Sequence, residues 1–148
     1  MIDLPTEADT ARLGAWLAGK LKTGEAICLS GPLGAGKSTL ARALIRALTT
    51  PDEEVPSPTF TLVQHYEGAA MEVAHFDLYR LTNAHEAYEI GLDEALELGA
   101  VIIEWPERLE GQLPADRLDI RLYLTATGRT AQLEGFGRWK DRELELEA

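Results

Sequence analysis

Apolar residues along the chain follow two patterns, one typical of helices and one typical of buried strands. After Thr6, which has an acid three residues later, apolar side chains recur at helical spacing, and Gly24 is expected to end this helix. Leu40, Leu44, Ile45 and Leu48 mark one face of a second helix that stops near Pro51. Asn83 with Glu86 predicts a further helix, interrupted by Gly91, and Asp93 is expected to cap a short turn after it.

Strands are predicted between these helices. Unbroken apolar runs indicate strands covered on both faces, and an alternating run indicates a half-buried strand. Gly128 is expected to form a turn that leads from the alternating strand into a partner strand. The predicted strands are 26–29, 59–66, 71–76, 100–103, 118–124 and 130–136. This order of elements favours an α/β fold with a mostly parallel central sheet, antiparallel additions and flanking helices.

The chain length of 148 residues favours a single domain. We expect that domain to span residues 1–136, followed by a charged and loosely held tail over 137–148. Three prolines and three acids in residues 49–58 predict a loop. The one cysteine, Cys28, excludes an internal disulfide and is expected to be a small buried hydrophobe.

Charge narrows the functional classes. Lysine and arginine number 14 against 25 aspartates and glutamates, which gives a net charge of −11. An acidic protein repels a phosphate backbone, so we do not expect autonomous nucleic-acid binding or docking on an anionic membrane. A partner is then expected to hold any nucleic acid. No secretory pattern or long apolar run is evident, and the cytoplasm is the expected location.

Residues 31–38 match the phosphate-binding loop pattern G-x-x-x-x-G-K-[ST] at every fixed position. Glycines allow backbone N–H groups to face phosphate oxygens, and the following helix adds the positive end of its dipole. Lys37 would contact the β- and γ-phosphates of a nucleotide, and the Ser38 hydroxyl would be a ligand of Mg²⁺. Pro32 lacks an N–H group and must stand where no donor is required.

Such a site needs acids at the ends of neighbouring strands. Glu104, which follows four apolar residues, is the candidate magnesium-site acid, with a solvated strand-end acid as the alternative. Asp77 could orient a nucleophilic water, or it could be a cap or turn acid. Arg80 could neutralise transition-state charge, or form a surface ion pair. A metal pair of His75 with Asp77 is disfavoured, because no third ligand has suitable spacing.

Other segments of the chain bear on which nucleotide is bound and on which class of reaction follows. Without an Asn-Lys-x-Asp segment the sequence favours ATP over GTP. Hydroxyl groups in the Ser57–Thr61 segment could sense a γ-phosphate as a switch loop does, although a plain strand entry is equally compatible. Trp105 could pack beside a nucleotide or in the core. An ATPase, a small-molecule kinase and a nucleotide-gated adaptor all remain open at this point.

Five segments in order resemble one family. They are Gly31-Pro32-Leu33-Gly34-Ala35-Gly36-Lys37-Ser38-Thr39, Ser57-Pro58-Thr59-Phe60-Thr61-Leu62-Val63, His75-Phe76-Asp77-Leu78-Tyr79-Arg80-Leu81, Gly91-Leu92-Asp93-Glu94 and Ile103-Glu104-Trp105-Pro106-Glu107-Arg108. In this spacing the chain resembles the TsaE (YjeE) family, the ATPases of bacterial tRNA threonylcarbamoyladenosine biosynthesis, from about Thr6 to Leu124.

The resemblance implies a P-loop ATPase that uses ATP and Mg²⁺, works with TsaB and TsaD, and meets tRNA only through that complex. It implies catalytic roles for Asp77, Lys37 and Arg80, and magnesium ligation by Ser38 and Glu104. Its implied nucleotide-binding residues are Gly31, Leu33, Gly34, Ala35, Gly36, Lys37, Ser38, Thr39, Thr59, Thr61 and Trp105. The chain departs from the family pattern at Pro32, often an acid; at Ser38, often threonine; and at Gln64-His65, where Asn-Glu is expected.

Overall fold

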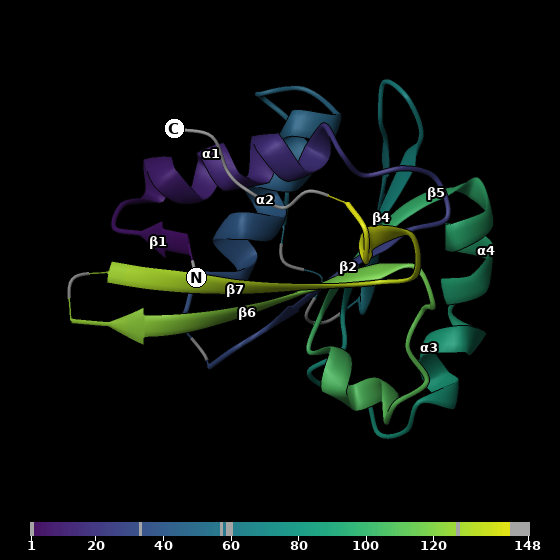
Figure 1. Ribbon diagram of the computed structural model, residues 1–148. Coiled ribbons are helices and arrows are strands. Elements are labelled where there is room, and N and C mark those ends of the chain that lie inside the picture. The colour runs from purple at the N-terminus through teal and green to yellow at the C-terminus, as the bar shows by residue number, and fades with distance from the viewer. Residues whose placement is uncertain (1, 33, 57, 59–60, 127, 143–148) are drawn as a thin grey trace.

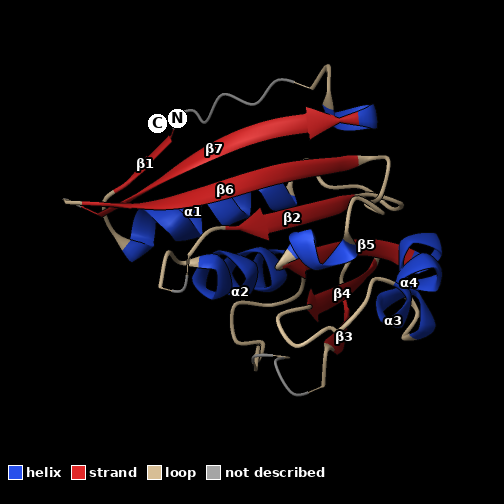
Figure 2. Ribbon diagram, turned by 90° about the horizontal axis from the view of Figure 1, so that it is seen from below, coloured by secondary structure: helices blue, strands red, loops and turns tan. Residues whose placement is uncertain are grey.

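A seven-stranded sheet forms the centre of the computed structural model, which describes residues 2–32, 34–56, 58, 61–126 and 128–142. The strand order is β1-β7-β6-β2-β5-β4-β3, and Figure 2 shows the strands in this succession. The strands are β1 (Ile2–Leu4), β2 (Ala26–Ser30), β3 (Val63–Glu67), β4 (Glu72–Asp77), β5 (Gly99–Glu104), β6 (Arg117–Thr125) and β7 (Gly128–Phe136).

The four central strands, β6, β2, β5 and β4, are mutually parallel, while β3, β7 and β1 add antiparallel pairings at the two edges. This confirms the predicted fold class. Strand β1 was not predicted, because Ile2-Asp3-Leu4 is too short to show a period. It forms by pairing with β7, with Ile2 opposite Ala131.

Helices cover both faces of the sheet. One face packs against α1 (Glu7–Ala18) and α2 (Lys37–Leu48), and the other against α3 (His85–Glu89) and α4 (Leu92–Leu98) (Figure 1). Short 3₁₀ helices lie at Pro106–Leu109 and Gly137–Trp139. The apolar strand residues divide between two cores, because successive side chains of a strand point to opposite faces.

The start of α1 confirms the predicted cap, whereas its end does not. Thr6 and Asp9 form a reciprocal capping box. The helix ends at Ala18, with Gly19 as its C-cap, so the prediction that Gly24 ends it was wrong. Leu21 fits the helical spacing of the apolar residues and is buried in the same core, but it lies in the segment that follows the helix.

Two further boundaries differ from the sequence predictions. Helix α4 has Gly91 as its N-cap, with φ of 100° and no side-chain bond, so Asp93 lies in the first turn instead of capping it. Strand β3 begins only at Val63, because Leu62 takes a left-handed conformation with φ of 68°. The described part of the loop over 49–58 contains neither helix nor strand, as predicted.

The C-terminal segment is anchored, so the expectation of a loose tail was wrong for residues 137–142. Trp139 is fully buried against the α1–α2 side of the sheet. The two terminal guanidinium nitrogens of Arg142 each lie 2.8 Å from a carboxylate oxygen of Glu25, which is itself fully buried. Residues 143–148 lie outside the described residues.

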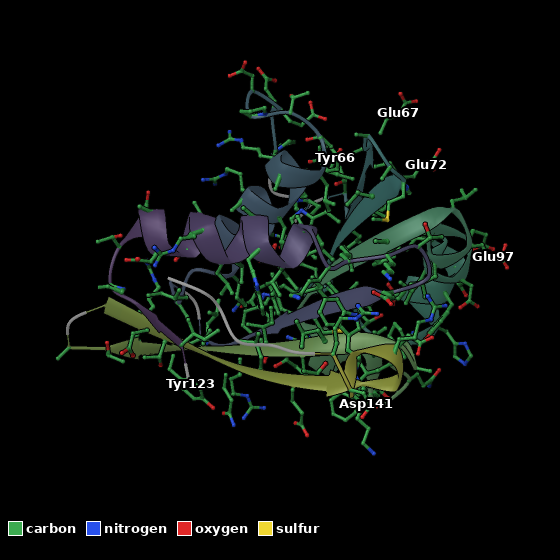
Figure 3. The ribbon with its side chains drawn as sticks, turned by 45° about the horizontal axis from the view of Figure 1, so that its top comes forward. Tyr66, Glu67, Glu72, Glu97, Tyr123 and Asp141 are labelled. Atoms are coloured by element: carbon green, nitrogen blue, oxygen red, sulfur yellow. The ribbon has the colours of Figure 1, made fainter. Side chains whose placement is uncertain are left out.

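Acidic side chains on the surface account for much of the net charge, and Figure 3 shows Glu67, Glu72 and Glu97 pointing outward. Cys28 is free and buried, as expected, and burial raises the pKa of its thiol. Within the described part of the chain, we find no helix with the length and apolar character needed to cross a membrane.

Candidate nucleotide-binding site

The glycine-rich loop joins the end of β2 to the start of α2. Gly31 has φ of 139°, and a Cβ built there would lie 2.5 Å from the carbonyl oxygen of Leu122, so a larger residue cannot occupy this position. Gly36 has φ of 101° and caps α2 without a side-chain bond. Its left-handed conformation directs the chain into the helix, as expected of the second fixed glycine of the loop. Leu33 lies outside the described residues.

Lys37 folds back over the loop that precedes it. Its side chain is buried, and Nζ donates to the carbonyl oxygens of Gly31 and, at 3.3 Å, of Pro32. The ammonium group also lies 3.8 Å from the centroid of the Trp105 ring. Burial lowers the pKa of Lys37, against the opposing effect of nearby acids. Pro32 thus contributes its carbonyl oxygen as an acceptor for the Lys37 ammonium group.

Ser38 and Glu104 meet although 66 residues separate them. Ser38 Oγ donates to Oε1 of Glu104 at 3.1 Å, and Glu104 is the last residue of β5, where it is 2% exposed. The other carboxylate oxygen lies 2.6 Å from Nε2 of His75, which is also buried. From the sequence, His75 was a candidate only for a metal pair with Asp77, which was disfavoured. In the structure it contacts the carboxylate of Glu104 instead.

Asp77 ends β4 directly beside Glu104. The two residues are partners in the β4–β5 register, so their side chains lie on the same face of the sheet. Asp77 is 5% exposed and accepts a hydrogen bond from the backbone N–H of Tyr79 at 3.1 Å. Its position at the strand end agrees with the carboxylate placement expected from the sequence.

A cavity of about 300 Å³ brings these side chains together. Its lining residues are Gly34, Gly36, Lys37, Ser38, Thr39, Asp77, Tyr79, Glu104, Trp105 and Arg129. The rings of Tyr79 and Trp105 lie 4.9 Å apart, centroid to centroid, and form one wall. Trp105 therefore lies beside the phosphate loop, and it also packs against the edge of the core on the α3–α4 side of the sheet.

Some predicted residues do not line this cavity. Arg80 is exposed and is not part of the lining. Thr61 is also exposed, and its hydroxyl accepts a hydrogen bond from Gln64 at 3.1 Å. Thr59 lies outside the described residues. Tyr79 and Arg129 line the cavity but were not predicted as site residues. Arg129 belongs to none of the sequence motifs, and the pairing of β6 with β7 brings it to the phosphate loop.

The oxygen atoms of Ser38 and Glu104 fit a magnesium ion. Mg²⁺ prefers oxygen ligands and is usually held by one or two carboxylates together with substrate phosphates, not by a cage of protein groups. The described residues contain no cluster of three or more histidine, cysteine or acidic side chains that could hold a metal by themselves.

Parallel strands β4, β5 and β2, the glycine-rich turn and the helix after it define a P-loop protein of the nucleotide-binding class. The family model described as "Threonylcarbamoyl adenosine biosynthesis protein TsaE" matches residues 4–131. The chain belongs to the TsaE family.

Individual relatives agree with this assignment. The tRNA threonylcarbamoyladenosine biosynthesis protein TsaE of Rickettsia felis is 36% identical to this chain, over 82% of this chain and 71% of that protein. The protein of the same name from Aquifex aeolicus is 42% identical, over 71% of this chain and 75% of that protein. The crystal structure of Bacillus subtilis YdiB superposes with a TM-score of 0.73 and 27% identity, covering 90% of this chain and 82% of that one.

Proposed function

We propose that this protein binds Mg-ATP at the loop over residues 31–39 and hydrolyses it to ADP and phosphate. The observation that carries the proposal is the 3.1 Å contact of the Ser38 hydroxyl with the Glu104 carboxylate, beside Lys37. These are the hydroxyl, the acid and the cation that a P-loop enzyme uses to hold Mg²⁺ and the phosphates. ATP and Mg²⁺ are the cofactors proposed here.

Each side chain has a separate task in this reaction. The Lys37 ammonium would exchange the carbonyl oxygens of Gly31 and Pro32 for phosphate oxygens, which are stronger acceptors. Ser38 and Glu104 would hold the magnesium ion, which neutralises charge on the phosphates when bound. Asp77 would orient the water that attacks the γ-phosphorus as the bond to the ADP oxygen breaks.

His75 supports Glu104 in this scheme. An ionised carboxylate can only accept hydrogen bonds, so Nε2 of His75 carries the proton in the 2.6 Å contact. The contact fixes one oxygen of Glu104 and leaves the other directed at Ser38. Such outer partners of a metal-ligating carboxylate hold its orientation.

We further propose that the hydrolysis supports tRNA N6-threonylcarbamoyladenosine synthesis in the cytoplasm, in a complex with TsaB and TsaD. The names of the relatives refer to this biosynthesis. The net charge of −11 argues that tRNA is held by the partners and not by this chain. Arg80 and the Ser57–Thr61 segment, including Thr59 and Thr61, are proposed to reach the γ-phosphate only when a partner docks.

A phosphate-release assay tests this proposal. We expect slow hydrolysis by the chain alone, faster hydrolysis when TsaB and TsaD are added, and weak binding of tRNA by the chain alone at physiological salt. Phosphate release without an added acceptor would distinguish an ATPase from a small-molecule kinase. Identical rates in every mixture, or tight tRNA binding by the isolated chain, would contradict the proposal.

A further inference from the structure

Arg129, the second residue of β7, reaches the phosphate loop from 95 residues away. Its Nη2 donates to the carbonyl oxygen of Gly34 at 3.3 Å. A Cβ built on Gly36 would lie 3.0 Å from Cδ of Arg129 and 3.2 Å from its Nε. The side chain therefore lies against the Gly36 backbone, and it lines the same cavity as Lys37 and Ser38.

The strand register explains why Arg129 points toward the loop. Arg129 is opposite Leu124 in the β6–β7 ladder, and Ala131 is opposite Leu122. Leu122 and Ala131 are buried in the core shared with α1 and α2, so the alternation of β7 places Arg129 on that face of the sheet. Tyr123 lies on the other face, and Figure 3 shows it pointing away from α1.

The charges of the cavity make Arg129 important for an anionic ligand. Among the described lining residues, Lys37 and Arg129 are the basic side chains and Asp77 and Glu104 are the acidic ones. Without Arg129 the lining would carry more acids than bases, in a chain of net charge −11. A guanidinium also presents a planar fork of donors that matches phosphate oxygens.

The hydrogen bonding of Arg129 is incomplete in the described part of the chain. Its Nε is buried and has no hydrogen-bond partner there. Leaving a buried donor of a charged group unpaired costs free energy, so such groups normally find an acceptor. A phosphate oxygen in the cavity beside Gly36 would be an acceptor of the right charge.

We propose that Arg129 is a second phosphate-binding cation of this site, and that it contacts the α- and β-phosphates of the nucleotide. This rests on the proposed function, because it assumes that the cavity takes a nucleoside polyphosphate. Asp77 and Glu104 end β4 and β5, on one side of β2, so a magnesium ion held by Glu104 would neutralise charge toward the γ-phosphate end of the nucleotide. Arg129 comes from the opposite side of β2, past β6, and so meets the other end of the phosphate chain.

The test compares Arg129→Met with Arg121→Met by calorimetric titration of ATP and of ADP in the presence of Mg²⁺. Arg121 lies on β6, is exposed, and lines a separate cavity with Cys28 and Glu134, so its removal deletes the same charge away from the loop. We expect Arg129→Met to weaken ATP and ADP binding by the same factor, roughly ten-fold, and Arg121→Met to change neither. Arg129→Lys, which keeps the charge but not the fork, should fall between.

Salt separates a phosphate contact from a purely structural role. A charge contact is screened, so the difference between wild type and Arg129→Met should shrink as NaCl is raised. A difference independent of salt would mean that Arg129 only supports the Gly34 carbonyl, and would overturn the inference. Equal affinities of the two methionine variants, or a loss confined to ATP, would overturn it as well.

The outcomes also distinguish this inference from the proposed function. If the wild-type protein binds neither nucleotide, both are wrong. If the wild type binds ATP and the Arg129 variants bind it equally well, only the role of Arg129 is wrong. If Arg129→Met fails to fold, Arg129→Lys is the deciding variant. Wild-type affinity of Arg129→Lys for both nucleotides at low salt would then overturn the contact between the guanidinium fork and the phosphates.

Discussion

Nε2 of His75 lies 2.6 Å from Oε2 of Glu104, and both side chains are buried. The contact links β4 to β5 near the phosphate loop. The other oxygen of the same carboxylate accepts a hydrogen bond from the Ser38 hydroxyl. One buried imidazole therefore sets the orientation of the acid that we assign to magnesium.

Replacing His75 tests this link. His75→Phe removes the hydrogen bond and keeps an aromatic ring, so Glu104 loses its fixed orientation. We expect the Mg²⁺ concentration that supports half-maximal ATP binding to rise roughly ten-fold, the range typical for outer partners of metal ligands. A magnesium titration at constant ATP measures it. The control is His65→Phe on β3, where the side chain is exposed. Equal magnesium dependence in the two variants would contradict the role of His75.

Lys37→Ala tests nucleotide binding itself. The change removes the ammonium group that would contact the phosphates, and charge-assisted hydrogen bonds of this kind contribute about 1.5–3 kcal/mol. We expect ATP affinity to fall at least roughly ten-fold in calorimetry. Lys22→Ala removes an exposed lysine and serves as the control. Unchanged affinity in Lys37→Ala would argue against the loop as the phosphate site.

Asp77→Asn separates chemistry from binding. The amide keeps the shape of the side chain and its acceptor oxygen, but it no longer carries the negative charge that would orient the attacking water. ATP affinity should stay close to that of the wild type, while the rate at saturating ATP and Mg²⁺ should fall roughly a hundred-fold. Glu104→Gln should instead weaken magnesium-dependent binding.

Glu72→Gln, at the exposed opposite end of β4, controls for the loss of one negative charge in this strand. If Asp77→Asn and Glu104→Gln both hydrolyse ATP at the wild-type rate, the separate roles given to the two acids are wrong.

Arg142→Met tests the anchoring of the C-terminal segment. The substitution leaves the carboxylate of Glu25 buried without its bidentate partner, and breaking such a pair costs about 3 kcal/mol. Denaturant unfolding should show that loss of stability. Lys140→Met, at an exposed position in the same segment, should be nearly neutral.

Removing the buried charge as well should recover stability. The double variant Glu25→Gln with Arg142→Met is expected to be more stable than Arg142→Met alone, because the fully buried carboxylate that lost its bidentate partner is replaced by a neutral amide. A single variant as stable as the wild type would show that the ion pair does not hold the segment.

Asp119 gives the protein a pH-dependent contribution to stability. Partial burial raises the pKa of Asp119 above 3.8, although Arg117 donates to it at 3.0 Å. The folded state then binds the proton more tightly than the unfolded state, so stability falls as pH rises from 3.8 through the raised pKa. Asp119→Asn does not titrate, and its melting temperature should rise relative to that of the wild type over this range.

Calorimetric melting curves of both proteins at a series of pH values measure the effect. Asp52→Asn, in the exposed loop after α2, is the control. A difference in melting temperature between Asp119→Asn and the wild type that stays constant from acid to neutral pH would contradict the prediction.

The sequence by itself determined the elements that depend on neighbours in the chain. The phosphate loop over 31–38 and the Thr6–Asp9 capping box are recognisable because a few consecutive residues make their own contacts. Strands β2 and β5 were recognisable from unbroken apolar runs, and β6 from alternating apolar residues. The placement of Glu104 followed from the same reasoning, since an acid directly after such a run lies at the end of a strand, and Asp77 was placed at the end of the predicted strand 71–76.

Tertiary structure decided the contacts between distant residues. Arg129 meets Gly34 across 95 residues, Arg142 meets Glu25 across 117, and His75 meets Glu104 across 29. None of these pairs leaves a local pattern, because each depends on which strands or segments lie side by side and in which register. The sheet order that places β6 and β7 beside β2 brings Arg129 to the phosphate loop, and burial of Trp139 brings Arg142 to Glu25. Hydrophobic packing of the whole chain, not any single segment, fixes that order.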